Sequence, residues 1–387
     1  MKSSPPFYGE AGWLQWPDNA EYSHQFMRVL GSAQEGASTI SECFHAAKLV
    51  DPGNDESWYA AWKHVAEINR ARGDEAFAKG ELNTATANWL RASNYLRTAE
   101  VFLVSKDPRR KQLLRGMKKC SRQFLEHSRP KGEVIRIPYE DGFLEGYFIE
   151  SPNLRPWLPV VICVGGPDTY KEDLLYTVRQ SAAGNDLSVL LIDAPGAEAV
   201  LDENKLSPRV DVEVPIARWV DYLVSRGDVD SSKIAIYGSG LGGPYATRSA
   251  SHDPRLAAAV CDGGLWDRHE RLFVASRRAA AGGEATDGDR VQLAGENHLG
   301  TKVKCPYLMT IGQHDFLAVD DAMEIFKTAR RAGMPVDLKV FSAEETAASP
   351  GHIDNPTLAN EFIFEWIRER LKVSEAISAD AESAETC

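Results

Sequence analysis

Residues 234–250 read IAIYGSGLGGPYATRSA, and this stretch decides the fold that the rest of the chain must build. Its apolar start, residues 234–237, predicts a short strand, and its second half predicts a helix. A strand, a tight glycine turn and a helix in this order form the turn that exposes a nucleophilic serine, with the pattern G-x-S-x-G. In residues 238–242, however, Ser239 lies one place early and the central residue is Gly240. The stretch therefore predicts such a turn with glycine at the nucleophile position.

The glycine spacing of this turn also fits a loop that binds the phosphates of a dinucleotide. Such a loop would follow the first strand of a sheet, with an acidic residue about 20 positions further on. Here the turn follows the fifth strand-like run, so no dinucleotide cofactor is expected. A metal centre is not expected either, because histidine and cysteine residues do not cluster at ligand spacings.

Strand-like and helical segments alternate from residue 131 onward. The first two strand-like runs flank the sequence PYEDG and predict a hairpin. The later runs are short, apolar and separated by helices, which is typical of a parallel sheet covered on both faces. The runs are Val134–Ile137, Leu144–Ile149, Val160–Val164, Ser188–Asp193, Lys233–Tyr237, Ala257–Asp262, Tyr307–Ile311 and Val336–Phe341. The predicted fold class is therefore α/β, with a mostly parallel eight-stranded sheet.

Residues 20–127 follow a helical period instead. Trp58, Trp62, Val65 and Ile68 recur at spacings of three and four, which marks one face of a helix. We interpret this aromatic stripe as part of the hydrophobic core rather than as a ligand-binding surface. The expected divisions are an all-helical cap domain over residues 1–130, an α/β domain over 131–373 and a disordered acidic tail over 374–387.

The composition is that of a soluble globular protein. With 56 acidic against 44 basic residues the formal net charge is -12, which argues against a nucleic-acid partner, since such surfaces are basic. No run approaches the roughly 20 apolar residues of a membrane helix, and the N-terminus lacks the apolar segment of a signal peptide. The six cysteines are scattered without CxxC pairs, as in proteins of a reducing cytoplasm. We expect a cytoplasmic protein without membrane or nucleic-acid partner, and a homodimer is left open.

Active sites in parallel sheets lie at the carboxyl ends of the strands, so the residues that follow each strand are the candidates. Gly166 belongs to a glycine pair after the third strand-like run, where backbone N–H groups can stabilise an oxyanion. Asp315 follows the seventh run, and His352 lies in the loop before the last helix. The order of turn, acid and base is that of a catalytic triad, in which a carboxylate orients a basic imidazole. We therefore expect Asp315 to bind His352, with the neighbouring His314 only flanking the site.

Together these segments resemble the α/β-hydrolases that include the fermentation-respiration switch protein, pseudo-oxynicotine hydrolase and the fungal hydrolases that shorten polyketides. The likeness is carried by ESWYAAW, WLRASNYLRTAEVFL, VGGPDTYKED, IDAPGAEA, IYGSGLGGPYATRSASHDPRLAAAVCDGG, GQHD and GHIDNPTLANEFIFEWI. It implies an α/β-hydrolase fold with a helical cap. It also implies hydrolysis of a carbon–carbon bond in a β-diketone-like substrate, or of an ester, between the two domains.

The resemblance also implies roles for single residues. Asp315 and His352 take the acid and base positions, and Gly240 takes the position of the nucleophile. The N–H groups of Leu241 and Gly166 take the positions of the oxyanion hole, the first because it follows the nucleophile. The expected partner is a small carbonyl compound of aromatic or polyketide type.

The glycine at position 240 leaves several interpretations open. If the chain has lost the nucleophile and kept the pocket, His352 can deprotonate a substrate or a water molecule while an oxyanion hole stabilises an enolate. A lyase, isomerase, cyclase or water-mediated hydrolase would work in this way. The glycine can instead be an engineered replacement that silences the enzyme. Ser239 can also serve as the nucleophile after a one-residue slip, although the turn should aim it away from His352. A non-catalytic ligand-binding protein is the remaining alternative.

Overall fold

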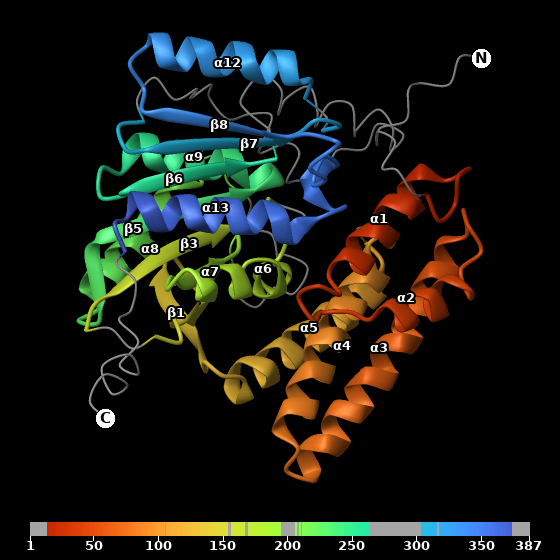
Figure 1. Ribbon diagram of the computed structural model, residues 1–387. Helices are drawn as coiled ribbons and strands as arrows, with labels where there is room; N and C mark the ends of the chain where they lie inside the picture. The colour runs from red at the N-terminus through yellow and green to blue at the C-terminus, as the bar shows by residue number, and fades with distance from the viewer. Residues whose placement is uncertain are drawn as a thin grey trace, which may run out of the picture.

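The structure is a computed structural model that describes most of the chain. The described residues are 14–104, 106–153, 156–166, 169–194, 206, 209, 211–263, 303–315 and 317–373. The predicted tail over residues 374–387 lies outside them. Figure 1 shows a helical region, coloured red to orange, beside a sheet that has helices on both faces.

The N-terminal region is helical, as the period of its sequence predicts. Its described helices are α1 (Ala20–Gly31), α2 (Ile40–Ala47), α3 (Asp55–Ala78), α4 (Leu82–Glu100) and α5 (Pro108–His127). The side chains of Asn19, Thr39 and Asn54 accept hydrogen bonds from the first turns of α1, α2 and α3, which stabilises the start of each helix. Trp58 and Trp62 of the predicted stripe are fully buried in the aromatic core of this region. The interpretation of the stripe as core is therefore confirmed.

The second region is an eight-stranded sheet in the order β1-β2-β4-β3-β5-β6-β7-β8. Its strands are β1 (Gly132–Tyr139), β2 (Gly142–Ile149), β3 (Leu158–Val164), β4 (Ser188–Ile192), β5 (Val229–Ser239), β6 (Ala258–Asp262), β7 (Tyr307–Gly312) and β8 (Val336–Phe341). β1 and β2 form an antiparallel hairpin, β2 pairs antiparallel with β4, and the other neighbours pair in parallel. The prediction of a mostly parallel eight-stranded sheet after an N-terminal helical region is confirmed.

Helices cover both faces of this sheet. The helices on one face are α8 (Glu213–Ser225), α9 (Gly243–His252) and α12 (Val319–Arg331), and those on the other are α6 (Lys171–Thr177), α7 (Arg179–Gly184) and α13 (Pro356–Arg370). The side chains of β3 alternate between the two layers, with Val160 and Ile162 in one core and Val161 and Cys163 in the other. Because both faces are covered, the central strands read as continuous apolar runs.

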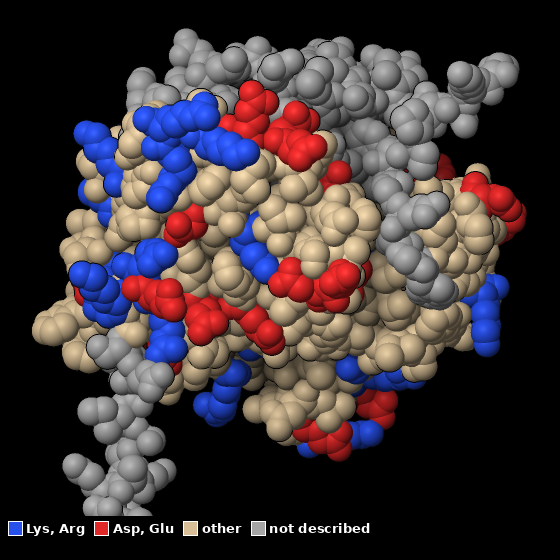
Figure 2. Space-filling model, turned by 45° about the horizontal axis from the view of Figure 1, so that its top comes forward, with Lys and Arg blue, Asp and Glu red and all other residues tan. Residues whose placement is uncertain are grey.

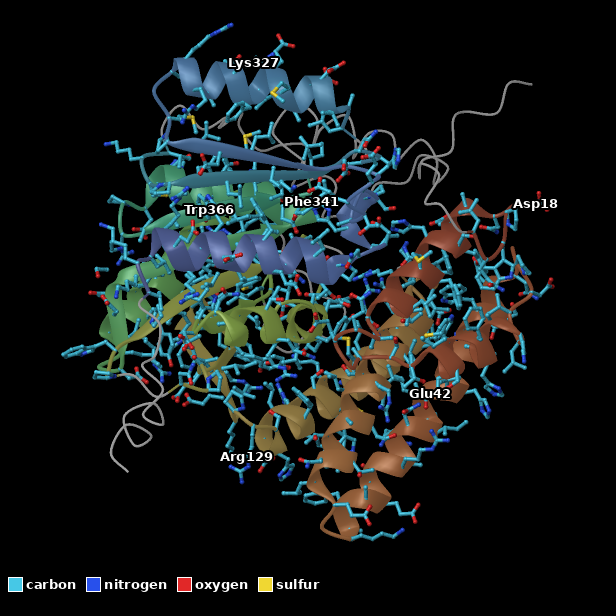
Figure 3. All side chains as sticks on the ribbon, in the orientation of Figure 1. Asp18, Glu42, Arg129, Lys327, Phe341 and Trp366 are labelled. Atoms are coloured by element: carbon cyan, nitrogen blue, oxygen red, sulfur yellow. The ribbon has the colours of Figure 1, made fainter. Side chains whose placement is uncertain are left out.

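The helical region meets the sheet near the end where the parallel strands finish. A Cβ on Gly31, the last residue of α1, would lie 2.8 Å from the carbonyl oxygen of Ile353, in the loop after β8. Figure 3 shows the two ends of the sheet, with Phe341 at the end of β8 and Trp366 of α13 at the other end. The loop after β8 therefore lies between the sheet and the helical region.

The surface carries charges of both signs. Figure 2 shows acidic and basic side chains interspersed on one face of the molecule. Helix α12 is an example, with Asp320 and Asp321 in its first turn and Arg330 and Arg331 in its last, an order that complements the helix dipole. Across the described part of the chain, no helix combines the length and the apolar character that crossing a membrane requires. In the same part of the chain, no three His, Cys, Asp or Glu side chains gather as metal ligands.

Candidate active site

β5 ends in the turn that the sequence singles out. Ser239 is the last residue of the strand, Gly240 begins a short 3-10 turn, and α9 follows from Gly243. Gly240 has a φ of +53°, in the left-handed region that residues other than glycine rarely adopt. Sharp turns that expose a nucleophile hold that residue in a strained conformation. The chain therefore turns at Gly240, and the assignment of Gly240 to the nucleophile position stays a prediction.

Close contacts require glycine at the two outer positions of the motif, but the centre is open. A Cβ on Gly238 would lie 2.2 Å from the carbonyl oxygen of Gly242, and a Cβ on Gly242 would lie 2.3 Å from that of Val164. A Cβ on Gly240 would meet no atom of the described residues within 4 Å. A side chain at the centre of the turn would therefore have room, whereas one at either outer position would not.

His352 lies in a short 3-10 turn, Pro350–His352, between β8 and α13, and it is 2% exposed. Its Nε2 atom lies 3.0 Å from Oδ1 of Asp262, and its Nδ1 atom lies 2.6 Å from the carbonyl oxygen of Ala347. The ring packs edge-on against Phe341, with centroids 4.8 Å apart. Both ring nitrogens are thus engaged by oxygen acceptors in a buried position.

The loop around His352 holds a strained backbone in place. Ala347 and His352 both have positive φ, which costs free energy in residues with a side chain. The carboxylate of Asp354 accepts the N–H groups of Ala348 and Ser349, each at 3.0 Å. These bonds fix the loop, so the orientation of the imidazole is set by the backbone as well as by its ring partners.

Asp262 is the last residue of β6, and its carboxylate accepts two further hydrogen bonds. Oδ2 accepts the hydroxyl of Tyr237 at 2.7 Å, and Oδ1 accepts that of Thr310 at 2.6 Å. The sheet register brings these side chains together, because Asp262 pairs with Ser239 on β5 and with Thr310 on β7. Several donors on one carboxylate offset the cost of removing its charge from water.

Burial and the carboxylate of Asp262 have opposite effects on the pKa of His352. Burial lowers the pKa of the imidazole, but the charge and hydrogen bond of Asp262 and the carbonyl of Ala347 raise the pKa to about 9 overall. Burial also raises the pKa of Asp262, yet His352 and the two hydroxyl donors bring that pKa below its ordinary value. At neutral pH the two residues therefore form an imidazolium–carboxylate pair, with His352 donating from both nitrogens.

We expect this pair to make the free energy of unfolding depend on pH. The pKa of His352 is about 9 in the folded chain and has an ordinary value of 6.5. Its contribution is therefore complete below about pH 6.5 and is lost as the pH rises through about 9, by at most about 1.4 kcal/mol per pH unit. Urea unfolding of the wild type and His352→Gln at a series of pH values measures this contribution as the difference between the two proteins. A difference that stays constant across the range would mean that the folded imidazole is already neutral.

Asp315 is not the partner of His352 in the structure, so the expected bond between them is corrected to one with Asp262. The charge of Asp315 adds only the smallest contribution to raising the pKa of His352. The physical reason lies in the sheet. Asp262 ends a central strand, whose pleat and register direct its side chain, whereas Asp315 lies in the turn beyond β7. The strand-end criterion that selected Asp315 also fits the run Ala257–Asp262, so it could have found Asp262. A catalytic role for Asp315 stays a prediction.

Ser239, the last residue of β5, lies beside Asp262 of β6. It is half-buried, and its register opposite Asp262 puts its side chain on the same face of the sheet as that carboxylate. Burial and Asp262 raise the pKa of Tyr237 well above its ordinary value, and a hydrogen bond with Ser239 lowers it. The described hydrogen bonds of the His352 ring go to Asp262 and Ala347, and the expectation that the turn aims Ser239 away from His352 stays a prediction. A nucleophilic role for Ser239 also stays a prediction.

Gly166 and Leu241, the residues expected at the oxyanion hole, lie in contact. A Cβ on Gly166 would lie 2.3 Å from the Cβ of Leu241, so the turn after β3 approaches the turn after β5 as closely as glycine allows. The N–H group of Thr169 closes the first of these turns by donating to the carbonyl of Gly166 at 3.1 Å. The structure brings the two backbones together, and their role in stabilising an oxyanion stays a prediction.

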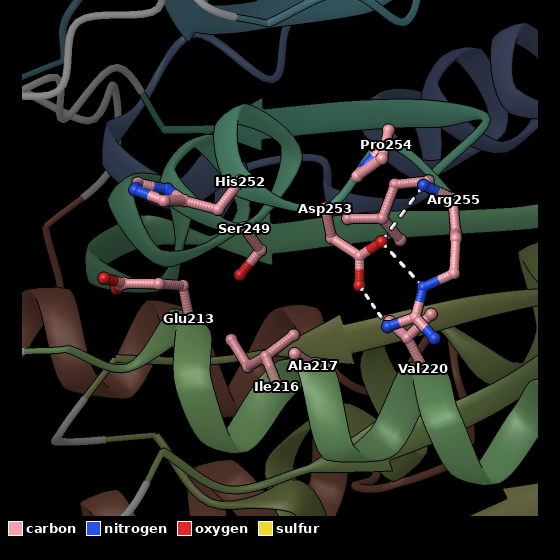
Figure 4. A pocket seen from close by; sticks show the side chains of 10 residues that line it. Glu213, Ile216, Ala217, Val220, Ser249, His252, Asp253, Pro254 and Arg255 are labelled. Atoms are coloured by element: carbon pink, nitrogen blue, oxygen red, sulfur yellow. Dashed lines mark hydrogen bonds and ion pairs between the residues drawn. The ribbon is translucent and has the colours of Figure 1, made fainter.

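A pocket of about 310 Å³ lies in a different place, between α8 and the end of α9 with the segment that follows it (Figure 4). Ile216 and Val220 form its apolar side, and an ion pair between Asp253 and Arg255 borders it. Helix α9 begins at the turn after β5 and runs back along the sheet, so its last residues lie at the edge opposite Gly240. This pocket therefore does not belong to the candidate active site.

Comparison with known sequences identifies related hydrolases. Residues 215–373 match the prolyl oligopeptidase family. The alpha/beta hydrolase xenA of Xenoacremonium sinensis is 34% identical over 251 residues, which cover 62% of this chain and 58% of xenA. The 20-hydroxy-prefusarin hydrolase FUS2 of Gibberella moniliformis is 32% identical over 261 residues, which cover 63% of this chain and 61% of FUS2. The chain thus spans about three fifths of the length of these curated relatives.

Comparison with solved structures identifies the fold. The structure of 2,6-dihydroxy-pseudo-oxynicotine hydrolase superposes with a TM-score of 0.71 at 19% sequence identity, over 88% of this chain and 95% of that one. The chain therefore has the α/β-hydrolase fold, and the resemblance to α/β-hydrolases that its motifs carry is confirmed.

Proposed function

We propose that the chain is an enzyme that uses the buried His352–Asp262 pair for acid–base chemistry on a small carbonyl compound, without a serine nucleophile. One observation carries this proposal: the buried, hydrogen-bonded His352–Asp262 pair lies beside the turn after β5, in which Gly240 has no side chain. Gly263 follows Asp262, and a Cβ built on it would lie 3.3 Å from the Cα of Gly240. This closeness supports a single site at the carboxyl ends of β5 and β6.

Without a protein nucleophile, water supplies the oxygen. It adds to a substrate carbonyl, the adjacent carbon–carbon bond breaks, and the bonding electrons leave as an enolate that takes up a proton. An imidazolium is a suitable acid for this step, and a pKa of about 9 keeps His352 protonated at neutral pH. The proton that the attacking water gives up returns to the imidazole, which balances the cycle. One ring nitrogen must exchange its protein acceptor for the substrate during turnover, since both are engaged in the resting site.

The open position at Gly240 supports this mechanism because a water molecule or a substrate oxygen can take the place of a serine hydroxyl. The N–H groups of Leu241 and Gly166 would hold the oxygen on which charge develops. Donors that are already in place cost no reorganisation when the charge forms. The close contact of the two backbones is the observation in favour of this role.

The substrate class rests on relatives rather than on the geometry. FUS2 is named as the hydrolase of 20-hydroxy-prefusarin, and the motifs of this chain resemble fungal hydrolases that shorten polyketides. We therefore propose a β-diketone or polyketide-like compound and carbon–carbon hydrolysis. A cytoplasmic location is proposed because the described cysteines are free thiols. A homodimer stays a prediction.

Ser239 carries a second candidate function, that of a serine esterase. Its register opposite Asp262 places it on the face of the charged pair. As a nucleophile it would need its hydroxyl within about 3 Å of the His352 imidazole. In the resting site that imidazole binds Asp262 and Ala347, which makes Ser239 the weaker candidate.

Replacing Gly240 by serine tests the proposal. We expect Gly240→Ser to lose most native turnover, because the hydroxyl fills the space that water uses. We also expect it to become covalently labelled by a fluorophosphonate probe. A Cβ at this position meets no described atom within 4 Å, so a serine has room, and the cost of the variant is the backbone strain of a positive φ. Labelling should accelerate towards about pH 9, where His352 loses its proton and can act as a base. Peptide mass spectrometry identifies the labelled residue.

Ser239→Ala is the matched control for this experiment. It should leave wild-type turnover nearly unchanged, and it should not prevent labelling in the Gly240→Ser background. Labelling of Ser239 in the wild-type protein would favour the esterase candidate and contradict the proposed mechanism.

A further inference from the structure

We propose that Arg97, on helix α4 of the helical region, is a positioning residue for the turn that carries Gly166. The proposal rests on the function proposed above, in which the N–H group of Gly166 stabilises an oxyanion. Arg97 would act through Tyr170 and Asp173, without contact to the substrate.

Arg97 is buried where the helical region meets α6. Its side chain is 9% exposed, its Nε donates to Oδ2 of Asp173 at 3.2 Å, and a terminal nitrogen donates to Glu100 at 2.8 Å. Its guanidinium also lies over the ring of Tyr170, 5.1 Å from the centroid. Arg97 therefore contacts both Tyr170, the residue before α6, and the carboxylate of Asp173 in the first turn of α6.

The carboxylate of Asp173, in the first turn of α6, has several hydrogen-bond and ion-pair partners. Its side chain is 1% exposed. Oδ2 also accepts the backbone N–H of Tyr170 at 2.9 Å, and Oδ1 accepts the hydroxyl of Tyr176 at 2.8 Å. Arg28 of α1 lies 3.4 Å from Oδ1. Burial raises the pKa of Asp173, but Arg97 and Arg28 hold that pKa below its ordinary value. The start of α6 is thus tied to two helices of the helical region by a single buried carboxylate.

Tyr170 connects this network to the candidate oxyanion hole. Its ring belongs to the aromatic core of the helical region, while its backbone precedes the first residue of α6. The adjacent Thr169 donates its N–H to the carbonyl of Gly166 at 3.1 Å. Gly166 in turn rests against Leu241 of the nucleophile turn. A continuous series of contacts therefore runs from Arg97 to the place where the substrate oxygen is expected.

The arrangement needs a guanidinium rather than any positive charge. Arg97 donates to two carboxylates and stacks on an aromatic ring at once, which a planar fork of donors allows. A lysine supplies a point charge that can satisfy one of these partners at a time. Arg97→Lys should therefore keep the buried charge balanced while loosening Tyr170.

Loosening this turn should affect the transition state more than substrate binding. An oxyanion donor acts on charge that develops only during the reaction, so a displaced Gly166 lowers kcat and leaves KM nearly unchanged. A merely structural role for Arg97 would change the stability of the whole protein without this split.

The test compares Arg97→Lys and Tyr170→Leu with the wild type. Tyr170→Leu removes the ring under the guanidinium and keeps all charges, so it serves if Arg97→Lys does not fold. Arg91→Lys is the control, because Arg91 lies on the same helix and binds Asn69 and Glu42 inside the helical region. Amide hydrogen exchange reports on the peptide from β3 to α6, urea unfolding reports on global stability, and turnover is measured with benzoylacetone, an aromatic β-diketone.

We expect exchange in that peptide to accelerate, and kcat to fall by about tenfold or more, in both test variants. Neither change should occur in Arg91→Lys. Unchanged exchange in both variants would overturn the proposal, and so would faster exchange with an unchanged kcat. If the wild type does not turn over benzoylacetone or a panel of related diketones and esters, the proposed function fails. The exchange measurement still decides whether Arg97 holds the turn.

Discussion

Replacing His352 by glutamine should lower the turnover of a β-diketone substrate by a factor of about 10² to 10⁴, the usual contribution of a positioned acid–base group. Glutamine keeps an amide N–H that can donate to Asp262, but it has no proton to transfer. The effect should appear in kcat, because His352 is buried and binds protein acceptors with both nitrogens in the resting site. Steady-state kinetics with benzoylacetone measures it.

His314→Gln is the matched control. His314 is exposed, lies next to Asp315, and is held through its backbone N–H, which donates to Ala348 at 2.8 Å. The same substitution there should leave kcat close to that of the wild type. If His352→Gln kept wild-type turnover, the His352–Asp262 pair would have no part in the mechanism. A large loss of kcat in His314→Gln would indicate that the acid–base group is His314, in the turn after β7.

Asp262→Asn should destabilise the protein by about 3 to 5 kcal/mol, the usual cost of removing one member of a buried ion pair. Asparagine keeps the shape of the side chain and removes the charge that favours the imidazolium. Burial then dominates the pKa of His352, which should fall well below 9. Urea unfolding measures the loss of stability, and a nuclear magnetic resonance titration of the His352 ring measures the fall in pKa.

Asp315→Asn distinguishes the His352–Asp262 pair of the structure from the His352–Asp315 pair that chain order alone led us to expect. Asp315 makes only the smallest contribution to raising the pKa of His352 and does not bind its ring nitrogens, so this variant should lose much less stability and shift that pKa little. A larger effect of Asp315→Asn than of Asp262→Asn would restore Asp315 as the partner of His352.

Local features were readable from the sequence by itself. The period of the apolar residues distinguishes the helical region from the sheet, because side-chain burial follows the period of each element. The register of the turn after β5 was also read locally, from the spacing of its glycines. In the structure, backbone atoms leave no room for a Cβ at positions 238 and 242, and Gly240 between them has the left-handed φ. That Gly240 takes the place of a nucleophile stays a prediction.

The partner of His352 was decided only by the tertiary structure. Asp262 and His352 are 90 residues apart, and two carboxylates at strand ends, Asp262 and Asp315, were compatible with the chain order. Which of them reaches the imidazole depends on strand order, on the parallel register that aligns Asp262 with Thr310, and on the strained loop that turns His352 inward. Strand order and register are set by pairing between segments that lie far apart in the chain. Spacing along the chain fixes which residues end the strands, but only the assembled sheet decides which carboxylate faces the histidine.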